Sequence, residues 1–142
     1  MAATFVEEVI FEAIIDSLLI ADKKSIEELT GNNGPLGTFS NKVMFAHALG
    51  LIGEEARSDL NIIRKIRNKA AHQMDPFSLS DQQMKDLTGN FTVRYYGIFP
   101  FEKKTLPDSP RDRYIETCEK IAMRLENSEP LFSGSKREPE VD

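Results

Sequence analysis

The sequence predicts an all-α protein. Apolar side chains recur three and four residues apart along most of the chain, which is the spacing of an amphipathic helix. Residues that cap helix starts, and glycines and prolines that end helices, separate these segments. We therefore expect a bundle of about five or six helices. Only residues 91–99 alternate apolar and polar side chains, and we expect an extended or hairpin-like loop there.

Length and composition fit one domain. A chain of 142 residues with 40% hydrophobic residues buries enough surface to fold without a disulfide or a metal. We expect a single helical domain over residues 1–127 and a disordered tail over 128–142, where prolines, a glycine and mixed charges replace the apolar pattern. The one cysteine, Cys118, lies on the apolar stripe of the last helix and is predicted to be a core residue rather than a nucleophile.

Charge and the first residues limit the location and the partners. No basic segment precedes the first apolar run, and acidic residues interrupt that run. We therefore expect neither a signal peptide nor a membrane span, and a cytoplasmic protein. The formal net charge of −5 has the wrong sign for non-specific attraction to a nucleic-acid backbone. A nucleic-acid role would need a local basic patch, or two patches brought together by symmetry.

Helix boundaries are predicted from capping residues. Thr4 with Glu7, and Ser25 with Glu28, have the spacing of a capping box, in which each side chain bonds a free amide of the first turn. Further helix starts are expected at Thr38 or Ser40, Glu54, Ser80 and Ser109, the last followed by a proline. The expected stops are the glycine-rich turn 31–37, Gly53, Asp75 with Pro76, and Gly89.

Several kinds of site are missing from the sequence. Two histidines and one cysteine lack the spacing of a zinc site, and we expect no metal and no cofactor. The glycines at 34–37 follow no strand and precede no Lys-Ser or Lys-Thr pair, so they form a turn rather than a phosphate-binding loop. The helices before residue 54 are separated by a seven-residue glycine-rich loop, which does not fit a helix-turn-helix. We expect no sequence-specific DNA binding.

The first helix has one narrow polar stripe, formed by Glu8, Glu12 and Asp16. The rest of its surface is apolar, so the helix should be buried on most sides, by its own core or by a second subunit. Carboxylates four residues apart on a helix repel one another by a few tenths of a kcal/mol per pair. Two interpretations fit the stripe: a solvated face, or a docking face for a basic partner.

The end of the fourth helix carries a basic surface. Arg64, Asn68 and His72 lie four residues apart and share one face, and Lys65 and Lys69 flank it. Such a surface is a candidate site for an anion.

Arg67 differs from its neighbours because it falls beside Ile63 on the inward side of the helix. A half-buried arginine needs a carboxylate or a phosphate. One interpretation pairs Arg67 with Asp59 or Asp16 and makes His72 a cap of the helix end. His47 is predicted to pack in the core or at an interface.

Two segments carry a family resemblance. Residues 34–52 begin Gly-Pro-Leu-Gly-Thr-Phe-Ser and end Ala-Leu-Gly-Leu-Ile, and residues 59–72 end Arg-Asn-Lys-Ala-Ala-His. Together they resemble the mannitol operon repressor (MtlR) family, and the second ending is similar to HEPN helical domains. The resemblance implies an all-α HEPN-like bundle, frequently a homodimer. It also implies a transcriptional regulator without a recognisable DNA-binding module, which would act through a regulatory protein partner.

Many HEPN domains are metal-independent endoribonucleases. The resemblance places their active site at Arg67 and His72, with Asn68 as the accompanying polar residue. Toxin-type members frequently have a tyrosine two residues after the histidine, and this chain has Met74 there. RNA would then contact Arg64, Lys65 and Lys69. His72 would transfer the proton and Arg67 would stabilise the phosphorane charge. On one continuous helix Arg67 and His72 are about 140° apart, so they converge only if the helix frays or two subunits meet on a two-fold axis. The regulator is the first hypothesis and the ribonuclease the second.

Overall fold

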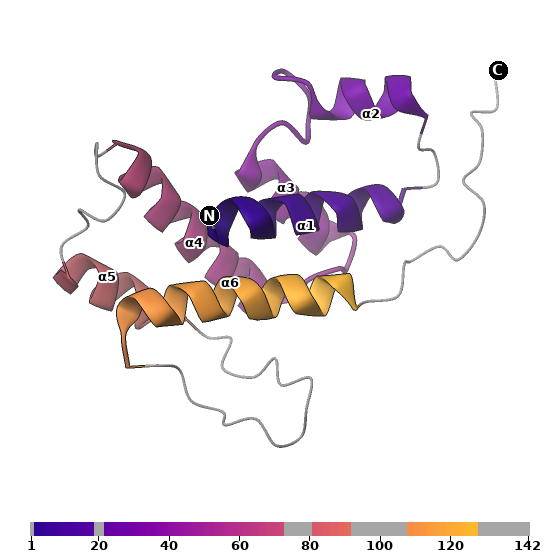
Figure 1. Cartoon of the computed structure of the whole chain (residues 1–142). Coiled ribbons are helices and arrows are strands. Elements are labelled where there is room, and N and C mark those ends of the chain that lie inside the picture. The colour runs from indigo at the N-terminus through magenta and orange to yellow at the C-terminus, as the bar shows by residue number, and fades with distance from the viewer. Residues whose placement is uncertain (1, 19–21, 73–80, 92–107, 128–142) are drawn as a thin grey trace.

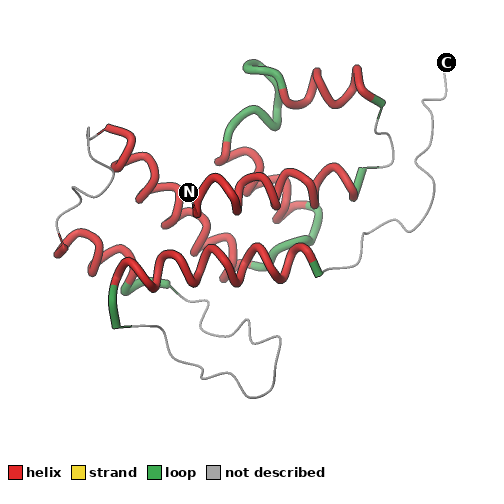
Figure 2. Tube along the Cα trace, viewed as in Figure 1, coloured by secondary structure: helices red, strands yellow, loops and turns green. Residues whose placement is uncertain are grey.

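The computed structural model describes residues 2–18, 22–72, 81–91 and 108–127. Within these ranges the chain forms helices and loops and no strand (Figure 2). The helices are α1 (Ala2–Asp16), α2 (Lys23–Thr30), α3 (Phe39–Ala48), α4 (Glu54–His72), α5 (Asp81–Thr88) and α6 (Pro110–Glu126). The all-α prediction is confirmed. The extended segment predicted after Phe91 and the tail predicted over 128–142 lie outside the described residues.

The central element of the bundle is α1. It lies alongside α6 and packs on its other sides against α3 and α4, while α5 closes one end against α4 and α6 (Figure 1). The shorter α2 stands at the edge of the bundle and buries no residue completely. Among the described helices, none has both the length and the apolar composition that a membrane span requires.

The core is assembled from the apolar stripes that the sequence shows. In α1, Ile10 and Ile14 are fully buried, and in α4 the same is true of Leu60 and Ile63. Burying an aliphatic side chain of this size stabilises the fold by about 1.5–3 kcal/mol. Cys118 is also buried, and burial raises the pKa of its thiol to about 12. The prediction that Cys118 is a core residue is confirmed.

Two predicted capping boxes are wrong. The first helix begins at Ala2, because two alanines with high helix propensity extend it upstream, and Thr4 lies within it. In α2 the cap is Asp22, whose carboxylate accepts the Ser25 amide at 3.0 Å, so Ser25 is already helical. Both Asp and Ser are good caps, and the sequence alone does not order them. The predicted caps at Thr38 and Ser109 are confirmed.

The turn between α2 and α3 depends on close backbone contacts. A Cβ atom at Gly34 would lie 2.4 Å from the carbonyl oxygen of Leu29, so any other residue would force the backbone to move. The Leu36 amide donates to the same carbonyl oxygen at 2.8 Å, and the Leu36 side chain is buried. The end of α3 differs from the prediction: Gly50, with φ of 74°, takes the left-handed conformation expected of Gly53.

Candidate functional site

The inward arginine of α4 forms an ion pair that joins three helices. Arg67 donates a hydrogen bond from Nη1 to Oε2 of Glu7, on α1. Lys42, on α3, donates from Nζ to the other carboxylate oxygen of Glu7 at 2.9 Å. The side chains of Glu7 and Lys42 are each 16% exposed, and that of Arg67 is 35% exposed. One half-buried carboxylate therefore holds two cations from two other helices.

Aromatic rings lie under both cations. The guanidinium carbon of Arg67 lies 5.0 Å from the centre of the Phe39 ring, and Nζ of Lys42 lies 5.7 Å from the centre of the Phe11 ring. A cation over a ring face at this separation is attracted by about 0.5–1 kcal/mol, and by more when water is excluded. The rings thus fix the positions of both cations without adding negative charge.

The electrostatics of the cluster follow from this geometry. Burial acts to raise the pKa of Glu7, but the hydrogen bonds and positive charges of Lys42 and Arg67 together outweigh it, so the pKa of Glu7 is lowered. On α6, burial raises the pKa of Tyr114 far above its ordinary value, although the charge of Arg67 opposes the shift. The cluster therefore consists of an ionised carboxylate and two cations, and the charge of Arg67 also acts on the phenol of Tyr114.

The acidic partner of Arg67 is Glu7, and the predicted partners Asp59 and Asp16 are wrong. Asp59 is buried elsewhere on α4 itself, and Asp16 lies on the exposed stripe of α1. The predicted capping box used the Glu7 side chain to bond a free amide at the start of α1. Because α1 begins earlier, at Ala2, the Glu7 carboxylate is not needed there and faces the bundle. A signal was present: Glu7 continues the buried stripe of Ala3, Ile10 and Ile14, at helical spacing.

The other basic residues of α4 lie apart from this ion pair. Lys65, Asn68 and Lys69 are exposed, which agrees with the predicted surface. Arg64 is half-buried, and its Nε atom is buried with no hydrogen-bond partner among the described residues. A surface that could attract anions is thus present on α4.

The predicted pair of Arg67 and His72 is not brought together by the backbone of α4. The helix continues without interruption to His72, so the two positions point about 140° apart on it. The side chain of His72 lies outside the described part of the chain. His47, at the end of α3, is half-buried, and its Nε2 lies 2.9 Å from the Glu54 carboxylate. No group of three potential metal ligands occurs among the described residues.

We expect the ion pair to make stability depend on pH on the acid side. Because the folded pKa of Glu7 is below its ordinary value of 4.5, the stabilisation is complete above that value and is lost as the pH falls through the folded pKa. The wild-type protein should therefore lose more stability than Glu7→Gln between neutral pH and about pH 3. Thermal melts across this range measure the difference, with exposed Glu8→Gln as the control for removing one carboxylate. A constant difference between wild type and Glu7→Gln at all pH values would contradict the assignment.

The comparison with protein families bears on the whole cluster. The model of the MtlR family, described as mannitol repressor, matches residues 4–124. The match begins in α1 and ends in α6, and it includes Glu7, Lys42 and Arg67. No curated protein and no solved structure matches the chain. Because the matched residues are most of the sequence, the chain belongs to the MtlR family of mannitol repressors.

Proposed function

We propose that the protein regulates transcription of a mannitol operon through a protein partner and does not itself read DNA bases. The observation that carries the proposal is the charge of a groove between α1 and α6. Four carboxylates line this groove, and no lysine or arginine does among the described residues. A surface of this charge repels a phosphate backbone but suits a basic protein segment. Exposed Met44 on α3 would also suit contact with a second subunit in a homodimer.

The ribonuclease alternative rests on the basic surface of α4. Lys65 and Lys69 are exposed there, and the buried Nε of Arg64 has no hydrogen-bond partner among the described residues. The ion pair between Arg67 and Glu7 argues against the ribonuclease, since a guanidinium that neutralises a carboxylate is less available to stabilise a phosphorane. This contact favours the regulator.

We expect the purified protein to give no specific complex with DNA from the promoter of a mannitol operon. At submicromolar protein and physiological salt, a footprint should be absent, because the net charge of −5 and the acidic groove disfavour the backbone contacts that specific binding requires. In cells of the natural host, deleting the gene should raise expression of a mannitol-operon reporter, and restoring it should lower expression again.

The footprint and the reporter assay test different parts of the proposal. A footprint that resists non-specific competitor DNA would show that the protein reads DNA directly. A reporter that does not respond to the deletion would contradict the regulatory role itself. The control is an unrelated promoter carried on the same reporter.

A further inference from the structure

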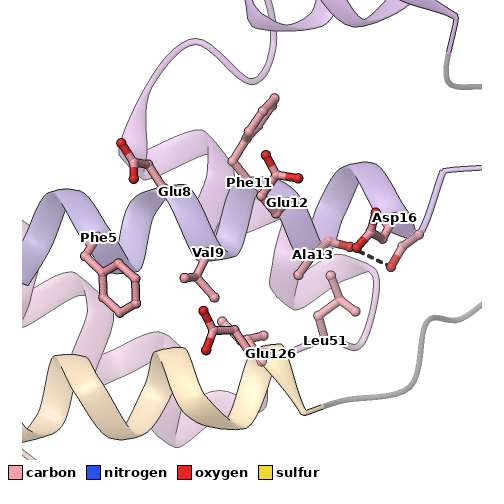
Figure 3. A pocket seen from close by; sticks show the side chains of 11 residues that line it. Phe5, Glu8, Val9, Phe11, Glu12, Ala13, Asp16, Leu51 and Glu126 are labelled. Carbon is pink, nitrogen blue, oxygen red and sulfur yellow. Dashed lines mark hydrogen bonds between the residues drawn. The ribbon is translucent and has the colours of Figure 1, made fainter.

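The groove between α1 and α6 has an apolar floor. It has a volume of about 740 Å³, and at one edge it reaches Phe11, whose ring lies under Lys42 of the ion-pair cluster. Phe5 and Val9 extend from α1 towards α6 (Figure 3). Leu125, on α6, also lines the groove. Phe5 remains 46% exposed, which is unusual for a phenylalanine on the central helix of a bundle. Val9 and Leu125 are buried, so among the described residues the most exposed apolar side chain of the groove is that of Phe5.

The rim of the groove is acidic. Glu8, Glu12 and Asp16 follow one another along α1, and Glu126 stands on α6 (Figure 3). The groove contains no lysine or arginine among its described lining residues. Glu8, Glu12 and Asp16 recur four residues apart on α1, and like charges at this spacing repel one another by a few tenths of a kcal/mol per pair. A cation that enters the groove relieves this repulsion.

A second exposed apolar side chain extends the surface along α6. Met123 is 45% exposed and precedes Glu126 by three residues, so the two share a face of the helix. Exposed phenylalanine and methionine beside carboxylates suit the apolar face of a basic amphipathic helix. The stretch of α1 from Phe5 to Asp16 is about 16 Å long, which matches about three turns of such a helix.

We propose that the α1–α6 groove binds a basic amphipathic helix of a partner protein. Its apolar side chains would contact Phe5 and Met123, and its lysines or arginines would pair with Glu8, Glu12 and Glu126. The partner chemistry follows from the charge of the rim, because an acidic or neutral helix would bring no positive charge to Glu8, Glu12 and Glu126. This inference rests on the proposed partner-mediated function and names the surface and the kind of partner.

The first test uses a labelled synthetic peptide of 18 residues, made of leucine and lysine in helical amphipathic order, and the full chain. Fluorescence anisotropy at about 0.15 M salt should show binding to the wild-type protein that the double substitution Glu8→Lys and Glu12→Lys weakens about 30-fold or more. The matched control is Glu27→Lys with Glu28→Lys on α2, which makes the same change of net charge at exposed positions and should leave binding within about threefold.

A further variant and a second peptide identify which features the groove recognises. Phe5→Ala should weaken binding about tenfold, since it removes the apolar anchor and no charge. A peptide of the same composition in scrambled order should bind at least about tenfold more weakly, because its leucines no longer share one face. Equal weakening by the α1 and α2 double variants, or equal binding of both peptides, would overturn the proposal. A third result would also overturn it: Glu8→Lys with Glu12→Lys abolishes self-association of the protein but leaves peptide binding unchanged. The occupant of the groove would then be a second copy of this chain.

A reporter assay separates this proposal from the proposed function. If expression responds to deletion of the gene but the Glu8→Lys and Glu12→Lys variant represses as wild type does, the groove proposal is wrong and the regulatory role stands. If expression does not respond to the deletion, the regulatory role is wrong, and peptide binding alone decides whether the groove recognises basic helices. Circular dichroism melts establish that each variant is folded before either measurement.

Discussion

Replacing Arg67 with alanine should lower the free energy of unfolding by about 2–3 kcal/mol, a value between those of exposed and fully buried ion pairs. The substitution leaves Glu7 with one cation where it had two, and it removes the guanidinium from the Phe39 ring. The side chain of Arg67 is 35% exposed, so water compensates part of the loss. Denaturation in urea measures the change.

The control is Lys69→Ala, on the exposed surface of the same helix, which should change the free energy of unfolding by less than about 0.5 kcal/mol. Similar stability of the Arg67→Ala and Lys69→Ala variants would mean that the ion pair contributes nothing to the fold. Glu7→Ala should destabilise the protein at least as much as Arg67→Ala, because it leaves Lys42 and Arg67 close together without their shared carboxylate.

The same variants decide between the regulator and the ribonuclease. If Arg67 stabilises the fold and does not act on RNA, the wild-type protein leaves single-stranded RNA intact in the presence of a chelator. His72→Ala should then cost about 1 kcal/mol or less, as expected for a contact at a helix end. Cutting that yields 2′,3′-cyclic phosphate ends, and that both Arg67→Ala and His72→Ala abolish in folded protein, would establish the enzyme instead.

Local pattern was sufficient for most of the fold. The apolar stripe of α4 through Leu60 and Ile63 was predicted, because helical spacing reports which face of a helix is buried. The start of α1 was not, because two alanines extend the helix upstream of Thr4. The start of α2 was not, because neighbouring residues compete for the cap. Asp22 and Ser25 are both suited to it, and the choice depends on where the first turn closes.

The candidate sites depended on contacts between distant residues. Glu7 and Arg67 are sixty residues apart in the chain, and nothing local specifies that α1 brings its carboxylate to α4. The acidic stripe of α1 was predicted, but its position beside Glu126 was not, because the sequence pattern does not say which helix lies next to α1. The sequence therefore fits both interpretations of the stripe, a solvated face and a docking face for a basic partner.

Replacing Phe91 with alanine should lower the free energy of unfolding by about 3–5 kcal/mol, which corresponds to a fall of roughly 10–15 °C in Tm. The alternation after residue 91 predicted a strand-like segment, but Phe91 itself is a core residue and is 1% exposed. It follows the end of α5, where the Gly89 amide donates to the carbonyl of Lys85 and the Phe91 amide to that of Thr88. Because the Phe91 ring is buried in the core, it holds the end of α5 against the rest of the bundle.

A matched substitution separates burial from the mere loss of an aromatic ring. Phe5→Ala makes the same chemical change at a side chain that is half exposed, and it should cost less than about 1 kcal/mol because little buried surface is lost. Equal falls in Tm for the two variants would show that Phe91 does not anchor α5. A large fall confined to Phe91→Ala would show that the turn after α5 contributes to the same cooperative core as α1 and α6, since one truncated ring would lower the transition of the whole domain.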